Sequence, residues 1–76
     1  MPGERILILA GTTEARALAN GLVALGIDVI SSFAGVTQDP VLPAGRIHRG
    51  GFGGVPGLAD FLRAEGISRV VDATHP

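Results

Sequence analysis

Apolar residues occur in short runs that glycine, proline and polar residues separate. The first run, residues 5–10 (RILILA), is apolar at every position after Arg5. A continuous run of this kind is typical of a strand buried on both faces, as in a parallel sheet. Three later segments predict further strands, namely residues 28–33 (DVISSF), 46–49 (RIHR) and 68–73 (SRVVDA).

Between the first two predicted strands, residues 14–25 place apolar side chains at helical spacing, so that they form one stripe. The stripe consists of Ala15, Leu18, Leu22 and Leu25. Thr12 or Thr13 is the predicted N-cap, because a hydroxyl oxygen accepts from the free N–H groups of the first turn. Gly26 suits the position just after the helix, where a left-handed conformation favours glycine.

A second helix is predicted after residues 50–54, which are too rich in glycine for regular structure, and before Gly66. Pro56 suits its first turn. Its apolar stripe consists of Leu58, Phe61 and Leu62. Residues 34–45 contain glycine, aspartate and two prolines, and therefore predict a loop. The resulting β-α-β-β-α-β order predicts an α/β fold, an open parallel Rossmann-like sheet with right-handed crossovers and strand order 3-2-1-4.

Unusual residues follow each of the four predicted strands. The segments are 11–14, 31–35, 50–54 and 72–76, and they gather glycines and polar side chains. In open α/β sheets, ligands bind beyond the carboxyl ends of the strands, where the strand order reverses. If the strands are parallel, the four segments meet at one edge, and the pattern predicts a nucleotide site there.

The turn Gly11-Thr12-Thr13-Glu14 leads into the first predicted helix. First-turn N–H groups have no acceptor inside a helix and the helix dipole favours an anion, so a phosphate group would bind here. The spacing matches neither G-x-G-x-x-G nor the P-loop motif, which needs a lysine that the chain lacks. An ordinary capped turn explains these residues equally well. Glu14 would repel a phosphate unless it points aside or bonds a ribose hydroxyl.

The end of the second predicted strand carries hydroxyl groups. NAD enzymes usually place an Asp or Glu here, which accepts from the ribose 2′-hydroxyl. This chain has Ser31 and Ser32 instead, and hydroxyls tolerate a 2′-phosphate, so NADP is favoured over NAD. Arg46 and Arg49 are candidate partners of that phosphate, although solvated surface arginines are an equally good interpretation.

The glycine-rich segment 50–54 would let backbone approach a ligand closely through Gly51, Gly53 and Gly54. Phe52 would pack on an adenine or on a macrocycle. A flexible turn with one buried phenylalanine is the alternative. Because four glycines in five residues carry an entropy cost, we favour the functional interpretation.

Polar residues also follow the last predicted strand. Asp72 would cap a turn or bond a ligand, and His75 would donate a proton or a hydrogen bond to a substrate. A lone histidine is more often structural. His48, inside the third predicted strand, is given the structural role.

Composition narrows the classes of function. The 76 residues are 46% hydrophobic and 17% charged, which is too apolar for a disordered chain. Without cysteine there are no disulfides or thiolate metal sites, and no metal site is predicted. The net charge is −1 and the six arginines are scattered, which argues against nucleic-acid binding. No segment has the roughly 20 apolar residues of a membrane span, and no signal peptide is recognisable, so a cytoplasmic location is expected.

Four motifs, in this order, resemble the N-terminal part of the precorrin-6A reductase family, known as cobalt-precorrin-6A reductase in the anaerobic route. The motifs are residues 6–16 (ILILAGTTEAR), 32–35 (SFAG), 50–58 (GGFGGVPGL) and 70–76 (VVDATHP). Together they cover nearly the whole chain. The resemblance implies NADPH-dependent reduction of a ring double bond in the precorrin-6A macrocycle, a tetrapyrrole, during cobalamin biosynthesis.

The resemblance also implies roles for particular residues. Residues 11–14 correspond to the loop at the cofactor phosphates, and Ser32, Ala34 and Gly35 to the loop beside the adenosine ribose. Val36 follows where an arginine is common in the family, which weakens the case for a 2′-phosphate partner at this position.

Residues 51–54 and 74–76 would flank the cofactor or the tetrapyrrole, with Thr74 or His75 orienting the substrate or relaying a proton. Family members are considerably longer and have a second α/β half. Residues 1–76 are therefore expected to be an N-terminal NADP-binding half-domain, completed by a missing C-terminal half or another chain. Two alternatives stay open, namely a non-catalytic nucleotide-binding or regulatory module and a fragment that folds only on a partner.

Overall fold

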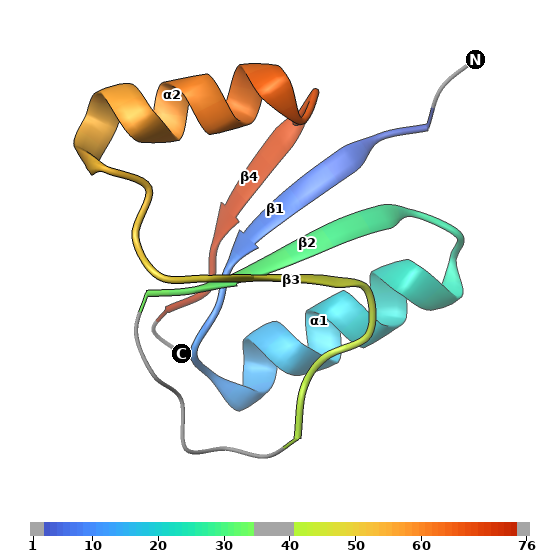
Figure 1. The fold of residues 1–76 in the computed structure, drawn as a ribbon. Helices are drawn as coiled ribbons and strands as arrows, with labels where there is room; N and C mark the ends of the chain where they lie inside the picture. Colours follow the sequence, from blue (N-terminus) through green and yellow to red (C-terminus); the bar gives the residue numbers. More distant parts are fainter. Residues whose placement is uncertain (1–2, 35–40, 75–76) are drawn as a thin grey trace.

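In a computed structural model that describes residues 3–34 and 41–74, the chain forms four strands and two helices. The strands are β1 (Arg5–Leu9), β2 (Asp28–Phe33), β3 (Arg46–Arg49) and β4 (Arg69–Asp72), and the helices are α1 (Thr13–Ala24) and α2 (Gly54–Ala64). The strands make one sheet in the order β3-β2-β1-β4, and every neighbouring pair is parallel. The predicted α/β class, element order and 3-2-1-4 strand order are confirmed (Figure 1).

β1 lies inside the sheet and forms much of its core. Leu7 pairs with Ile30 of β2 on one side and with Val70 of β4 on the other. Leu7 and Ile8 point to opposite faces, and both are fully buried. A strand covered on both faces has no solvent-facing position, which explains why every residue after Arg5 in this run is apolar.

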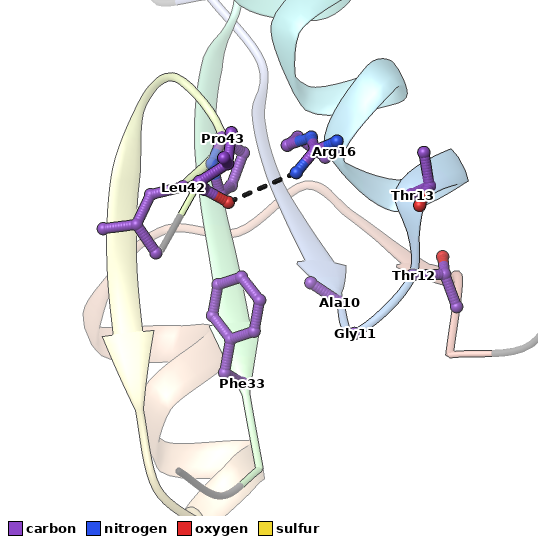
Figure 2. Close-up of a pocket in the computed structure, with 9 residues that line it drawn as sticks. Ala10, Gly11, Thr12, Thr13, Arg16, Phe33, Leu42 and Pro43 are labelled. Carbon is purple, nitrogen blue, oxygen red and sulfur yellow. Dashed lines mark hydrogen bonds between the residues drawn. The ribbon is translucent and has the colours of Figure 1, made fainter. Parts of the chain in front are cut away.

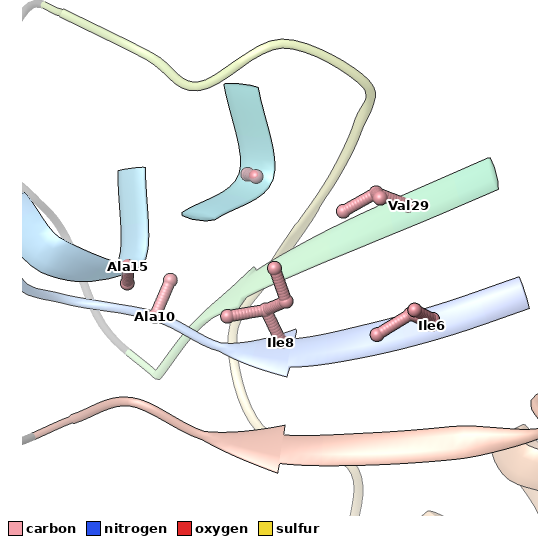
Figure 3. Packing of buried hydrophobic residues seen from close by; sticks show 6 residues of the cluster. Ile6, Ile8, Ala10, Ala15 and Val29 are labelled. Carbon is pink, nitrogen blue, oxygen red and sulfur yellow. The ribbon is translucent and has the colours of Figure 1, made fainter. Parts of the chain in front are cut away.

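Helix α1 covers one face of the sheet (Figure 1). Its buried residues Ala15 and Ala19 pack in one cluster with Ile6, Ile8 and Val29 of the sheet (Figure 3). Alanine side chains are short, so the helix backbone lies close to the strands while their larger side chains fill the space. This cluster is the hydrophobic core between α1 and the sheet, and each methylene group buried in it contributes about 0.8 kcal/mol to stability.

Helix α2 lies on the opposite face, as the right-handed crossover from β3 to β4 requires (Figure 1). Its Phe61 joins His48 and Phe52 in an aromatic cluster. The rings of His48 and Phe52 stack at 4.4 Å between centroids, and Phe61 meets them edge-on at 5.1 and 4.9 Å. Gly57 approaches Phe52 so closely that a Cβ atom would lie 1.7 Å from the Phe52 carbonyl oxygen. The position therefore accepts only glycine without movement of the backbone.

The ends of several elements differ slightly from the predicted ends. β1 ends at Leu9, one residue early, and α1 begins at Thr13 because Thr12 is its N-cap. β4 is shorter than predicted by one residue at each end. α2 begins at Gly54, which the prediction left outside regular structure. Left-handed Gly53, with a φ of 86°, turns the glycine-rich segment directly into the helix.

Charged side chains gather at the amino edge of the sheet. Arg5 Nε bonds Asp28 Oδ2 at 2.7 Å, and Arg5 Nη1 donates to the Glu65 carbonyl oxygen at 2.5 Å. The Glu65 carboxylate also accepts from Arg46 Nη1 at 2.9 Å. These contacts tie the end of α2 to the starts of β1, β2 and β3, at the edge opposite the glycine-rich turns.

Candidate functional site

Two pockets open at the carboxyl edge of the sheet, one on each face. The α1-side pocket, about 110 Å³, is lined by Ala10, Gly11, Thr12, Thr13, Arg16, Phe33, Val41, Leu42 and Pro43 (Figure 2). The α2-side pocket, about 150 Å³, is lined by Leu9, Ala10, Ser32, Ala34, Gly50, Gly51, Phe52 and Thr74. Because both contain Ala10, they flank the end of β1, where the strand order reverses toward β4.

Only some of the predicted site residues line these pockets. The α1-side pocket contains Gly11, Thr12 and Thr13, and the α2-side pocket contains Ser32, Ala34, Gly51 and Thr74. The residues that line neither are Glu14, Ser31, Gly53, Gly54 and Asp72. Gly35 and His75 lie outside the described residues.

Thr12 joins the first turn of α1 to the end of β4. Its Oγ1 accepts from the Ala15 N–H at 3.0 Å, so Thr12 is the N-cap, and it donates to the Ala73 carbonyl oxygen at 2.8 Å. The hydroxyl hydrogen is therefore occupied within the protein. Thr12 lines the α1-side pocket, but its hydroxyl hydrogen is not available to donate to a phosphate.

Thr13 and Arg16 bring polar side chains to the α1-side pocket. Thr13 is exposed in the first turn of α1, and its hydroxyl makes no hydrogen bond to a described residue. Arg16 lies three positions later, on the same side of the helix, and its Nη1 is 3.5 Å from the Val41 carbonyl oxygen (Figure 2). The sequence interpretation missed Arg16, although its spacing from Thr13 was a signal.

The two serines of β2 lie on opposite faces of the sheet, because successive strand residues alternate. Ser31 is fully buried, and its hydroxyl has no partner among the described residues. The prediction that Ser31 contacts a cofactor is therefore wrong for this structure. Ser32 is 5% exposed and lines the α2-side pocket, and its Oγ lies 3.2 Å from His48 Nδ1.

Arg46 and Arg49 lie at opposite ends of β3. Arg46 begins the strand at the amino edge and pairs with Glu65, which also raises the pKa of Arg46 through their hydrogen bond. It is on the wrong edge for a ribose phosphate, so that prediction is corrected. Arg49 ends the strand beside Phe33, at the carboxyl edge, and is exposed.

The glycine-rich segment has two separate roles. Gly50 and Gly51 line the α2-side pocket, whereas Gly53 and Gly54 begin α2. Phe52, between these two pairs of glycines, lines the pocket and also stacks on His48. His48 therefore has the structural role that the sequence indicated, inside the aromatic cluster.

Asp72 and Thr74 form a tight turn after β4. Asp72 Oδ1 accepts from the Thr74 N–H at 3.2 Å and from the Thr74 hydroxyl at 2.8 Å. Of the two predicted roles for Asp72, the structure shows the turn-capping one. Its effect is to fix the Thr74 side chain at the rim of the α2-side pocket.

Residues 3–34 and 41–74 contain no group of three or more His, Asp or Glu side chains placed to hold a metal ion. Neither helix in these ranges is long and apolar enough to cross a membrane.

Together, the parallel 3-2-1-4 sheet and the helix N-terminus at its carboxyl edge define a Rossmann-like α/β protein, with pockets where such folds bind nucleotides. The family model described as precorrin-6x reductase CbiJ/CobK matches residues 5–76. The chain therefore belongs to the precorrin-6x reductase family.

Individual relatives agree with this family. The chain is 55% identical over 73 residues to the precorrin-6A reductase of Rhodococcus erythropolis and 51% identical over 72 residues to that of Rhodobacter capsulatus. A solved structure of CobK precorrin-6A reductase aligns over 96% of the chain with a TM-score of 0.87 and 51% identity. In each case the chain spans 29% of the relative's length and 95–96% of its own.

Proposed function

We propose that this chain forms the NADPH-binding part of a precorrin-6A reductase, which reduces the precorrin-6A macrocycle in cobalamin biosynthesis. Family membership supports the reaction. The observation that carries the proposal for the cofactor is the α1-side pocket, where a helix N-terminus and the Arg16 guanidinium line one space at the strand-order reversal.

The α1-side pocket suits the pyrophosphate group of a dinucleotide. The first-turn N–H groups of α1 have no acceptor within the helix, and the helix dipole adds positive potential. Thr13 supplies a hydroxyl donor, and Arg16 supplies a guanidinium that bonds phosphate oxygens in pairs. Gly11, at a φ of 139°, brings its backbone to the rim without a side chain in the way.

The end of β2 favours NADPH over NADH. Ser32, Phe33 and Ala34 stand there, so no carboxylate among these residues would repel a 2′-phosphate. Arg49 ends the neighbouring strand on the same edge and pairs in register with Phe33. We assign Arg49 as the cation that faces the 2′-phosphate.

NADPH, when bound, supplies a hydride from the nicotinamide C4 atom. The chain's part is to hold the cofactor, while Thr74 and His75 orient the macrocycle or relay a proton. Since the chain spans 29% of its relatives' length, we assign the second wall of the substrate site to the remainder of such a protein or to another chain. That wall excludes water and positions the macrocycle. The cytoplasmic location expected from the sequence remains a prediction.

The proposal is tested by titrating the protein with NADPH and NADH and following the fluorescence of the reduced nicotinamide. NADPH should bind at least about tenfold more tightly, which corresponds to about 1.4 kcal/mol from the 2′-phosphate contact. Arg16→Ala should weaken NADPH binding by about tenfold to a hundredfold, the usual range for a hydrogen bond to a charged group. Arg63→Ala is the matched control, because Arg63 pairs with Asp60 in the last turns of α2.

Equal affinities for NADPH and NADH would contradict the choice of cofactor, and an unchanged Arg16→Ala variant would contradict the phosphate site. Measuring turnover distinguishes a reductase from a non-catalytic module of the same fold. With every chain that completes the site present, a reductase oxidises NADPH only when precorrin-6A is added. A binding module does not oxidise it.

A further inference from the structure

We propose that Asn20 is a positioning residue, which holds segment 41–45 against α1 and thereby fixes one wall of the α1-side pocket. Its Oδ1 accepts from the Ala44 N–H at 2.8 Å. Asn20 itself is exposed and is not among the described residues that line the pocket. It therefore acts through the segment that it holds, and the inference rests on the function proposed above for this pocket.

The α1-side pocket is built from two parts of the chain that are distant in sequence. The end of β1 and the start of α1 supply one part, and residues 41–43 supply a facing wall. Pro43 lies on one side of the pocket and Arg16 and Thr13 lie on the other (Figure 2). The width of the pocket therefore depends on how segment 41–45 is held relative to α1.

Segment 41–45 runs along α1 in step with the turns of the helix. Arg16, Asn20 and Val23 are spaced by four and three positions, so they lie on one side of α1. Arg16 Nη1 is 3.5 Å from the Val41 carbonyl oxygen at one end of the segment. At the other end, a Cβ atom on Gly45 would lie 3.3 Å from Val23 Cγ2. Of these contacts, the Asn20 bond has the usual length of an N–H···O hydrogen bond, so it is the main polar link between helix and segment.

The two ends of the segment are held to different degrees. Gly45 is left-handed, with a φ of 95°, and a Cβ atom there would lie 2.8 Å from the Val29 carbonyl oxygen of β2. This close approach fixes the end that leads into β3. Val41 and Leu42, which line the pocket, are 56% and 43% exposed. Loss of the Asn20 bond would therefore loosen the pocket wall while β3 stays in place.

The residue type at position 20 also indicates a role outside the helix. Asparagine is a weaker helix former than alanine, and Asn20 lies in the interior of α1 on its exposed side. An exposed position that served only the helix would favour a stronger helix former. The Asn20 carboxamide instead bonds a backbone group 24 positions away. The sequence therefore gives up some helix stability where the side chain reaches segment 41–45.

Hydrogen exchange of the Ala44 amide, followed by NMR, tests the contact without a ligand. Asn20→Ala removes the acceptor, so the Ala44 amide should exchange at least about fivefold faster, the change expected from one net hydrogen bond. Asn20→Asp keeps an oxygen acceptor at the same distance along the side chain and should exchange within about twofold of the starting protein. In the starting protein, saturating NADPH should slow this exchange further, because coupling between segment and ligand is reciprocal.

Titration with NADPH tests the consequence for the pocket. Asn20→Ala should weaken NADPH binding by about twofold to fivefold, because apparent affinity falls with the fraction of molecules in which the wall is in place. Its Tm should stay within about 4 °C of the starting value, since alanine improves the helix while one exposed hydrogen bond is lost. A purely structural role would move the Tm and not the affinity. In turnover assays with every chain that completes the site present, the KM for NADPH should rise by the same factor with kcat unchanged.

Gly21→Ala is the matched control at the neighbouring position. A Cβ atom there meets nothing within 4 Å, so the variant should raise the Tm by roughly 4–8 °C and leave NADPH affinity unchanged. If NADPH binds the starting protein and Asn20→Ala equally well, or if Ala44 exchanges as fast in Asn20→Asp as in Asn20→Ala, the inference is overturned while the proposed function stands. If NADPH does not bind the starting protein, both are overturned.

Discussion

Replacing Thr12 by valine should destabilise the protein strongly although the two side chains have nearly the same shape. The hydroxyl makes two hydrogen bonds, one from the Ala15 N–H and one to the Ala73 carbonyl oxygen. Loss of an N-cap costs about 1 kcal/mol, and loss of a partly buried hydrogen bond costs about another 1 kcal/mol. We expect Thr12→Val to lower the free energy of unfolding by about 2 kcal/mol.

The assay is chemical denaturation followed by circular dichroism, since the chain contains no tryptophan. For a domain of this size, about 2 kcal/mol corresponds to a fall in Tm of roughly 8–16 °C. Two variants serve as controls. Thr12→Ser keeps the hydroxyl and should retain most of the stability. Thr13→Val removes an exposed hydroxyl with no described partner and should change stability by less than about 0.5 kcal/mol.

For ligand binding, the order of the two threonines should be reversed. Thr13→Val should weaken NADPH binding while the protein stays as stable as before, whereas the main effect of Thr12→Val should be a loss of stability. If Thr12→Val is as stable as the starting protein, or if Thr12→Ser is as destabilised as Thr12→Val, the hydroxyl does not make the two hydrogen bonds described here.

Three further substitutions test the packing. Gly57→Ala should cost about 3 kcal/mol of stability, because the new Cβ would lie 1.7 Å from the Phe52 carbonyl oxygen, and a normal denaturation midpoint would refute that contact. Ser31→Ala should leave stability unchanged or raise it by about 1 kcal/mol, since a buried hydroxyl without a partner is removed; a clear loss would mean that this hydroxyl is satisfied. Arg5→Gln should cost about 1 kcal/mol because its contacts to Asp28 and Glu65 are partly exposed, and high salt should narrow the difference in midpoint.

The fold was largely predictable because local patterns and the fold agree. The unbroken apolar run of β1 indicated a strand buried on both faces. The predicted stripe of α1 was only partly right: Ala15 is buried and Leu22 packs against the core, but Leu18 and Leu25 are 37% and 76% exposed, and Ala19 is buried instead. With all strands parallel, the convergence of the turns at one edge followed. The ends of elements were less predictable, since a residue such as Gly54 joins a helix only because of the turn before it.

The site was predictable to a smaller extent, because its chemistry depends on contacts between distant residues. Nothing local shows that the Thr12 hydroxyl is occupied by Ala73, which lies 61 residues away. The burial of Ser31 follows from strand alternation, which the prediction did not apply. Arg46 could have been placed at the amino edge from the direction of its strand, and Arg16 from its position one turn after Thr13.

The hydrogen bond between Thr12 and Ala73 has a consequence for how the chain acquires its structure during translation. Both the acceptor of the Thr12 hydroxyl hydrogen and one side of the inner strand β1 are supplied by residues close to position 73. On the ribosome, the early βα unit therefore emerges with this hydrogen bond missing and with an open strand edge. Nascent chains stalled before this position should be readily cleaved by protease, and resistance should rise steeply once β4 has left the exit tunnel.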